Sequence, residues 1–235
     1  MKKALLTLII LFLSHTIVLS QNGNKDATFK LGLNVGPNYT SLRGGDFADG
    51  YTPQLGFFGG LNFEYQINSK LSIITGIHYD AKNLKADFID TFIIEPIGGP
   101  NETFETIIDN ELKFKYINIP IAARYYFSSA NRYFLDVGFF YNHLLKAQYI
   151  KSERQDSDLA VLGTNDDNLT DFIKNGELGI SLGIGKNWTI NQKNQLNVVL
   201  RNDFGFQDIQ ENSFFGVTSI KTNTLRLILN WNFEL

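Results

Sequence analysis

Residues 178–185 read Leu-Gly-Ile-Ser-Leu-Gly-Ile-Gly, with a large apolar side chain at every second position and glycine or serine between. Successive side chains of a β-strand point to opposite faces, so this stretch forms one apolar face and one narrow face of small residues. A helical period of 3.6 residues does not fit it. The same alternation recurs at 29–39, 54–67, 71–81, 113–127, 133–145, 177–188, 195–206 and 222–235. The sequence therefore predicts eight long β-strands.

Two kinds of protein contain such strands: a soluble barrel or sandwich with its apolar face inward, and a membrane barrel with its apolar face toward lipid. Soluble strands average about five or six residues, whereas a tilted membrane-spanning strand needs about 9 to 11. Glycine and small polar residues also suit the narrow interior of an eight-stranded barrel better than a water-exposed surface. We therefore predict an all-β fold, an eight-stranded antiparallel up-and-down transmembrane β-barrel.

Aromatic residues on the outward faces gather near the strand ends, as they do in the interfacial girdles of membrane barrels. One end has Tyr39, Tyr79, Tyr141 and Phe204. The other end has the larger predicted girdle: Phe29, Phe63, Tyr65, Tyr125, Phe127, Tyr133, Trp188, Trp231 and Phe233.

The connections between the runs alternate in length. Those at 68–70, 128–132 and 189–194 are short and polar, whereas those at 41–53, 84–112, 147–175 and 207–221 are longer. Bacterial outer-membrane barrels have short periplasmic turns and longer extracellular loops. We therefore expect a protein of the bacterial cell outer membrane with both termini in the periplasm.

The N-terminus has the composition of an export signal. Lys2 and Lys3 precede the apolar stretch 4–13, and cleavage after Ser20 would put Val18 and Ser20 at the two positions that a signal peptidase reads. This pattern predicts a signal peptide at 1–20, a short periplasmic segment at 21–28 and a barrel at 29–235. The alternative, a transmembrane anchor, needs about 20 apolar residues, and polar residues from Ser14 interrupt the run.

Composition excludes several function classes. Without residues 1–20 the chain has 19 basic and 24 acidic residues, a net charge of −5, which argues against nucleic acid as a partner. The chain has no cysteine, which excludes a disulfide scaffold, a thiolate metal site and an acylated lipoprotein N-terminus. We expect a monomer without a cofactor.

Four segments resemble the PorT-like outer-membrane β-barrel family of Bacteroidetes. They are LGLNVGPNY at 31–39, KYINIPIAARYYF at 115–127, LGISLGIG at 178–185 and LRNDFGF at 200–206. The resemblance covers essentially the whole chain after the signal peptide. It implies an outer-membrane barrel, and the family's named member is linked to a secretion system.

Charged residues on the inward faces are the main chemical feature. A hairpin symmetric about Ala130 places Arg124 opposite Asp136. Because buried charges persist only when paired, and eight strands enclose little space, we expect a plug of salt bridges rather than an ion path. The expected interior network comprises Lys30, Glu64, His78, Asp80, Lys82, Arg124, Asp136, Arg201, Asp203, Arg226 and Glu234.

Two other functions remain as alternatives. His78 near Asp80, with Ser72 on the same face, suggests a lipid-modifying hydrolase. Against it, these side chains face the interior, where lipid has no access. We therefore expect no catalytic residue, with the enzyme as one alternative and a narrow transporter or pore as the other.

The connection at 84–112 has seven acidic residues and one lysine, yet it is rich in phenylalanine and isoleucine. We predict that 88–95 and 103–109 extend the barrel as a hairpin with 96–100 at its tip. An apolar patch there would mark a docking surface for a protein partner. Its candidate residues are Phe88, Phe92, Ile93, Phe104 and Ile107.

The other expected partners are outer-membrane lipids and lipopolysaccharide, because acidic outer loops are able to hold divalent cations between lipopolysaccharide molecules. The second long connection, 147–175, has a net charge of −3. Oxygen-bearing residues at 164–171 lack the ordered spacing of a calcium loop. We expect a solvated acidic loop and no metal site.

Overall fold

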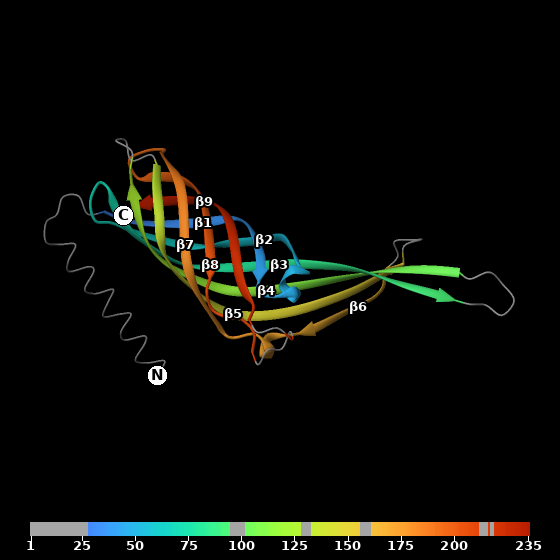
Figure 1. Cartoon of the computed structure of the whole chain (residues 1–235). Coiled ribbons are helices and arrows are strands. Elements are labelled where there is room, and N and C mark those ends of the chain that lie inside the picture. The colour runs from blue at the N-terminus through green and yellow to red at the C-terminus, as the bar shows by residue number, and fades with distance from the viewer. Residues whose placement is uncertain (1–27, 95–101, 128–132, 156–160, 212–215, 217–218) are drawn as a thin grey trace.

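Eight antiparallel strands close into a barrel in the computed structural model, which describes residues 28–94, 102–127, 133–155, 161–211, 216 and 219–235. β1 pairs with β2 on one side and with β9 on the other, and this second pairing closes the ring (Figure 1). The predicted fold class is confirmed. The ring consists of β1 (Thr28–Arg43), β2 (Thr52–Gln66), β3 (Leu71–Ile94), β4 (Glu102–Tyr126), β5 (Tyr133–Gln155), β7 (Gly176–Thr189), β8 (Asn194–Gly205) and β9 (Lys221–Glu234).

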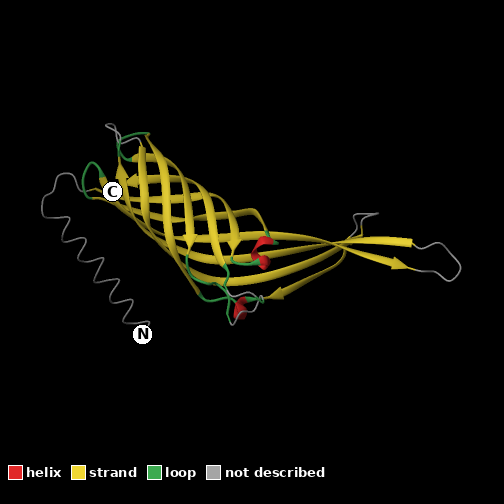
Figure 2. Ribbon diagram, in the orientation of Figure 1, coloured by secondary structure: helices red, strands yellow, loops and turns green. Residues whose placement is uncertain are grey.

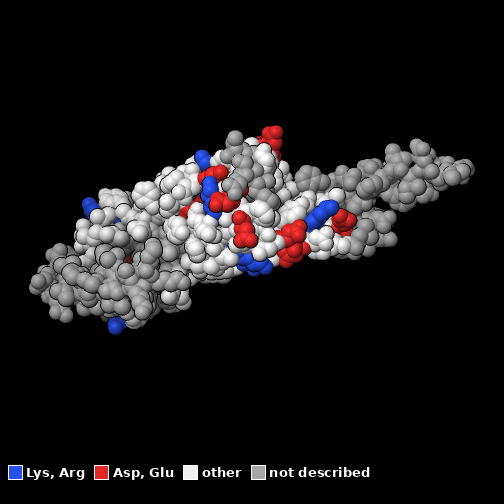
Figure 3. Space-filling view, turned by 90° about the horizontal axis from the view of Figure 1, so that it is seen from below, with Lys and Arg blue, Asp and Glu red and all other residues white. Residues whose placement is uncertain are grey.

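The apolar face of each strand points outward. Phe139 and Leu182 are 64% and 56% exposed, whereas Glu64 and Arg226 are 0% exposed. The side of the barrel in Figure 3 is largely free of charge, and charged atoms gather toward the end from which an extension projects. A surface of this kind is stable in hydrocarbon and unstable in water, as predicted for a barrel that spans a membrane.

Four strands form an extension, which projects from the end of the barrel opposite the C-terminus (Figure 1). The pairing of β2 with β3 ends at Thr52 and Lys85, but β3 continues to pair with β4 as far as Ile94 and Glu102. β5 pairs with β4 as far as Gln155, and β6 (Val161–Asn168) pairs with β5. The predicted hairpin is confirmed in its strands. Its tip at 96–100 lies outside the described residues.

The segment 147–175 differs from the predicted loop. Most of it forms the outer half of β5 and the whole of β6, which includes most of the acidic stretch 164–171. The sequence shows little alternation here because most of this part of the sheet lies beyond the barrel wall, where lipid does not require one face to be apolar. No group of acidic residues and histidines in the described ranges is arranged to hold a metal ion.

The end of the barrel that bears the extension is closed by short helices and loops (Figure 2). The helix α2 (Asp46–Asp49) and the 3₁₀ helix η1 (Thr170–Phe172) fold over this opening. Within the described ranges, no helix is long and apolar enough to cross a membrane.

A substitution at Gly36 tests how closely β1 and β9 approach each other. A Cβ atom at this position would lie 1.8 Å from the carbonyl oxygen of Leu227. Gly36→Ala therefore forces the two strands apart, and we expect a loss of about 1–3 kcal/mol in the free energy of unfolding. Urea titration in detergent micelles measures this loss. The control is Gly163→Ala, where an added Cβ meets nothing within 4 Å. Equal stability of the two variants would contradict the packing described.

Candidate functional site: the filled interior and the closed mouth

Arg124 is the centre of an ion-pair network near the end that holds the C-terminus. Its guanidinium donates two hydrogen bonds to Asp136, at 2.8 and 2.9 Å, and a third to Glu64 at 3.1 Å. Glu64 also accepts a hydrogen bond from the Tyr126 hydroxyl at 2.8 Å and lies 3.8 Å from Lys30 Nζ. Arg124 lies opposite Asp136 in the ladder between β4 and β5, as the symmetric hairpin predicts. Two-pronged pairing of this kind is the strongest form of arginine–carboxylate contact.

Asparagine side chains fill the next layer of the interior. Asn230 donates to Asn34 at 2.7 Å, and Asn197 donates to Asn230 at 2.6 Å. Nε2 of His78 lies 3.0 Å from the amide nitrogen of Asn34. A cavity of about 20 Å³ lies beside this layer, lined in part by Asn62. That volume holds about one water molecule and does not form a lumen.

A second ion-pair network lies beyond the asparagines. Arg226 pairs with Asp80 at 2.5 Å and with Asp203. Arg201 lies 3.1 Å from Asp203, and Asn38 donates to Asp80 at 2.7 Å. These side chains are buried, so each charge is neutralised by a neighbour rather than by water.

Glu177 forms a further buried ion pair with Lys82, although it is missing from the predicted network. Its carboxylate lies 3.0 Å from Lys82 Nζ and accepts hydrogen bonds from Asn142 at 2.7 Å and from Thr222. The signal was present, because Glu177 begins the inward face of the run 177–188.

Glu234 does not belong to the network, and its inclusion was wrong. It lies opposite Lys30 in the ladder but is half-buried at the end of β9, and no ion pair joins it to another described residue. Lys30 instead contacts Glu64 and donates to Gln195 at 3.0 Å. Carboxylates at strand ends reach solvent and therefore do not need a buried partner.

An apolar cluster seals the mouth of the barrel, meaning the end that bears the extension. Its side chains come from the inward faces of the strands and from the loops that fold over them, and it was not predicted from the sequence. Inward apolar residues such as Leu84, Leu112 and Phe114 were the available signal. The cluster comprises Leu42, Ala48, Leu84, Leu112, Phe114, Tyr116, Leu144, Ala147, Leu169, Ile173, Ile209 and Ile220.

The nine aromatic residues of the predicted girdle lie on the outward face. Phe63 is half-buried, and the other eight are exposed. Neighbouring rings contact one another, as in Phe29 with Phe63 at 6.5 Å and Phe127 with Tyr133 at 6.2 Å between ring centroids. They surround the end that carries the short connections, where an aromatic girdle stabilises a membrane boundary.

The side chains of the five candidate docking residues lie outside the described part of the structure. Only their backbone register is known, with Phe92 opposite Phe104 and Ile107 opposite Ile89. At the base of the extension, hydrogen bonds to the carboxylates of Asp87 and Asp109 raise the pKa of Lys85 above its usual value.

The structure separates the three residues of the hydrolase alternative. His78 contacts Asn34, whereas Asp80 pairs with Arg226 and Asn38. Ser72, His78 and Asp80 are each 0% exposed. A substrate therefore has no access to them from the lipid or from water.

Residues 19–211 match the family described as "Outer membrane protein beta-barrel domain". The chain belongs to this family. No curated protein matches the chain.

This outer-membrane barrel also matches solved structures at low identity. Neisserial surface protein A is 13% identical, with 90% of this chain and 100% of that chain covered and a TM-score of 0.46. A major outer membrane protein from Thermus thermophilus is 15% identical, with 89% and 99% covered and a TM-score of 0.43. Ail of Yersinia pestis is 10% identical, with 88% and 98% covered and a TM-score of 0.39.

A substitution at Asp136 tests whether the ion-pair network around Arg124 stabilises the barrel. Asp136→Ala leaves the buried guanidinium with Glu64 alone, and losing one partner of a buried ion pair costs about 3–5 kcal/mol. We expect a loss of that size in the free energy of unfolding, measured by urea titration. The control is Glu153→Gln, which breaks an exposed pair with Lys151 and costs less than about 1 kcal/mol. A cost for Asp136→Ala no larger than that of the control would show that the network does not stabilise the barrel.

The filled interior predicts the electrical behaviour of the barrel. Polar layers and the apolar cluster at the mouth leave no continuous water path, so we expect no stepwise conductance in planar bilayers. Reproducible single-channel steps from the purified barrel would restore the pore alternative.

Proposed function

We propose that this outer-membrane barrel is a non-enzymatic, monomeric display protein, whose rigid wall presents the extension for docking of a protein partner. The observation that carries the proposal is the continuation of β3, β4 and β5 beyond the barrel, where β3 pairs with β4 from Lys85 to Ile94 and β4 pairs with β5 from Lys115 to Thr106. A sheet anchored in this way loses little conformational freedom on binding, which favours affinity.

The proposed orientation places both termini in the periplasm and the extension outside the cell. It is supported by the projection of the extension from the end opposite the C-terminus. We also propose that the chain is a PorT-like member of its family, in line with the four sequence segments that resemble that group. A secretion-associated partner is consistent with this assignment.

The edge of β3 is the proposed docking element. Beyond Lys85, β3 has no partner on the β2 side within the described residues, so its backbone donors and acceptors remain available there. Natural proteins usually protect such edges with lysine or proline, and residues 86–94 contain neither. The connection 84–112 has a net charge of −6. The partner we propose is therefore an extended, basic segment that adds a strand to this edge.

Proximity crosslinking in intact cells tests the docking proposal. With a photocrosslinker at Thr91 on the β3 edge, we expect one reproducible protein adduct. Asp90→Lys places a positive charge on the edge and is expected to remove most of this adduct, since like charges repel a basic partner. Asp171→Lys makes the same charge change on the exposed helix η1 and serves as the control. Absence of an adduct, or equal loss in both variants, would contradict the proposal.

His78 tests the enzyme alternative. Because its side chain is buried and contacts asparagine, we expect His78→Ala to leave the lipid A composition of the cell unchanged. Mass spectrometry of extracted lipid A measures this. An altered acylation or phosphate pattern in folded His78→Ala would favour the enzyme instead.

A further inference from the structure

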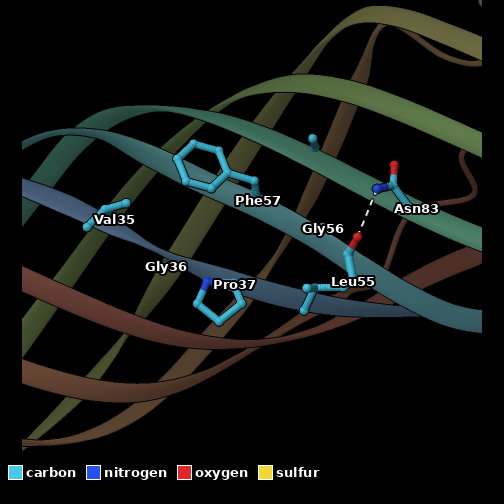
Figure 4. Close-up of a pocket in the computed structure, with 8 residues that line it drawn as sticks. Val35, Gly36, Pro37, Leu55, Gly56, Phe57 and Asn83 are labelled. Carbon is cyan, nitrogen blue, oxygen red and sulfur yellow. Dashed lines mark hydrogen bonds between the residues drawn. The ribbon is translucent and has the colours of Figure 1, made fainter.

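An apolar hollow of about 500 Å³ lies in the outer wall of the barrel, on β1, β2 and β3 (Figure 4). Val35, Leu55 and Phe57 border it with outward side chains that are exposed. Between them the outer face of the wall is recessed, because the residues there are glycine, proline and alanine, whose side chains are small or absent. The lining residues are Val35, Gly36, Pro37, Leu55, Gly56, Phe57, Ala81 and Asn83.

Interruptions in two ladders produce the hollow. The pairing of β2 with β3 shifts between Gln54 and Phe57, and the pairing of β1 with β9 lacks Gly36 and Pro37, since proline has no N–H to donate. Side chains satisfy the carbonyl groups that remain. Asn83 donates to the carbonyl of Leu55 at 2.9 Å, as Figure 4 shows, and Asn38 donates to that of Ala81 at 3.0 Å. The hollow therefore suits hydrocarbon, since these carbonyl groups need no water.

Two lysines that pair with no described residue adjoin the hollow. Ala81 lies opposite Lys115 in the ladder between β3 and β4, and Lys115 lies opposite Lys146 on β5. Like charges directly opposite each other on one face destabilise a sheet unless an anion lies between them. Neither ammonium group forms an ion pair or hydrogen bond with any residue in the described ranges.

The neighbouring lysines are different. Lys113 lies 2.6 Å from Glu111, and Lys85 lies 3.0 Å from both Asp87 and Asp109. Carboxylates therefore neutralise the lysines farther out on the extension. Lys115 and Lys146, at the boundary of the apolar wall, form a pair that no described carboxylate neutralises.

We infer that this face binds one phosphate-bearing, acylated glycolipid of the lipid A type, with an acyl chain in the hollow and a phosphate between Lys115 and Lys146. The site goes beyond the proposed function and rests on its orientation, which places the mouth in the outer leaflet. An acyl chain matches the shape and polarity of the hollow, and a phosphate matches the two ammonium groups. The hollow and the lysine pair adjoin in the ladder, so one amphiphilic molecule contacts both.

Native mass spectrometry of the detergent-solubilised barrel tests the inference, with diphosphoryl lipid A as the probe. We expect a one-to-one complex. Lys115→Gln with Lys146→Gln removes both ammonium groups and is expected to weaken binding at least ~10-fold, because charge-assisted hydrogen bonds to phosphate are lost. Ala81→Leu fills the hollow and is expected to weaken binding by a similar factor. The control, Lys70→Gln with Lys193→Gln, removes two exposed charges at the opposite end and should bind as the native chain does.

Two further probes distinguish the sources of the anion. Dephosphorylated lipid A is expected to bind at least ~10-fold more weakly than the diphosphoryl form. Inorganic phosphate at millimolar concentration is expected not to displace the lipid, because it makes no contact with the hollow. Heat-dependent migration on gels verifies that each variant is folded.

Several outcomes would overturn the inference. The first is binding of lipid A by the lysine variant that equals binding by the native chain, and the second is a loss of binding in the control that equals the loss in the lysine variant. The others are full displacement of the lipid by inorganic phosphate and unchanged binding by folded Ala81→Leu. The assay needs no protein partner, so its failure is distinguishable from failure of the docking proposal, which the crosslinking experiment tests separately.

Discussion

Hydrogen-bond closure of the backbone is the constraint on which the rest of the molecule depends. Hydrocarbon offers no partner for an N–H or C=O group, so a sheet in a membrane has to pair its first strand with its last. The pairing of β1 with β9 meets this requirement. Once the ring is closed, the outer face has to be apolar and the inner face has to hold whatever polar side chains remain. Alternation in the sequence is the direct result.

Inside the ring, the order of layers inverts that of a soluble protein. The polar layers, with the pairs of Arg124 and Arg226, lie within the part of the barrel that has the apolar wall. The apolar cluster around Leu112 and Phe114 lies at the mouth. Each layer seals the interior by a different physical effect, ion pairing in one and hydrophobic packing in the other. This filled interior favours functions that reside on the outer surfaces of the barrel.

The sequence predicts the membrane-spanning strands well because lipid imposes a strict period of two on them. It predicts the extension less well. Residues 147–155 belong to β5, yet their polar composition conceals the strand, because most of this segment lies beyond the barrel wall, where lipid imposes no alternation. The hairpin strands near Phe92 and Phe104 were predicted because they combine apolar residues with a turn-forming segment between them.

The interior network is predictable in outline and not in its pairings. Inward residues follow from alternation, but partners across the barrel depend on closure and stagger, which no local pattern records. Glu177 was missed and Glu234 was wrongly included for this reason. The hollow beside Ala81 was also not predictable, because it arises from a shift in register between β2 and β3.

The contacts across the barrel have a consequence for biogenesis. Lys82 and Glu177 are 95 residues apart in the chain, and Asp80 and Arg226 are 146 residues apart. A nascent wall that lacks β9 therefore leaves Asp80 without its arginine partner while Arg226 remains outside. Assembly intermediates therefore need either water inside the partly closed sheet or an insertase that shields the unpaired charge of Asp80. β9 supplies Arg226, so the interior charges are balanced only when this last strand has been added. The closed barrel can then be released into the bilayer.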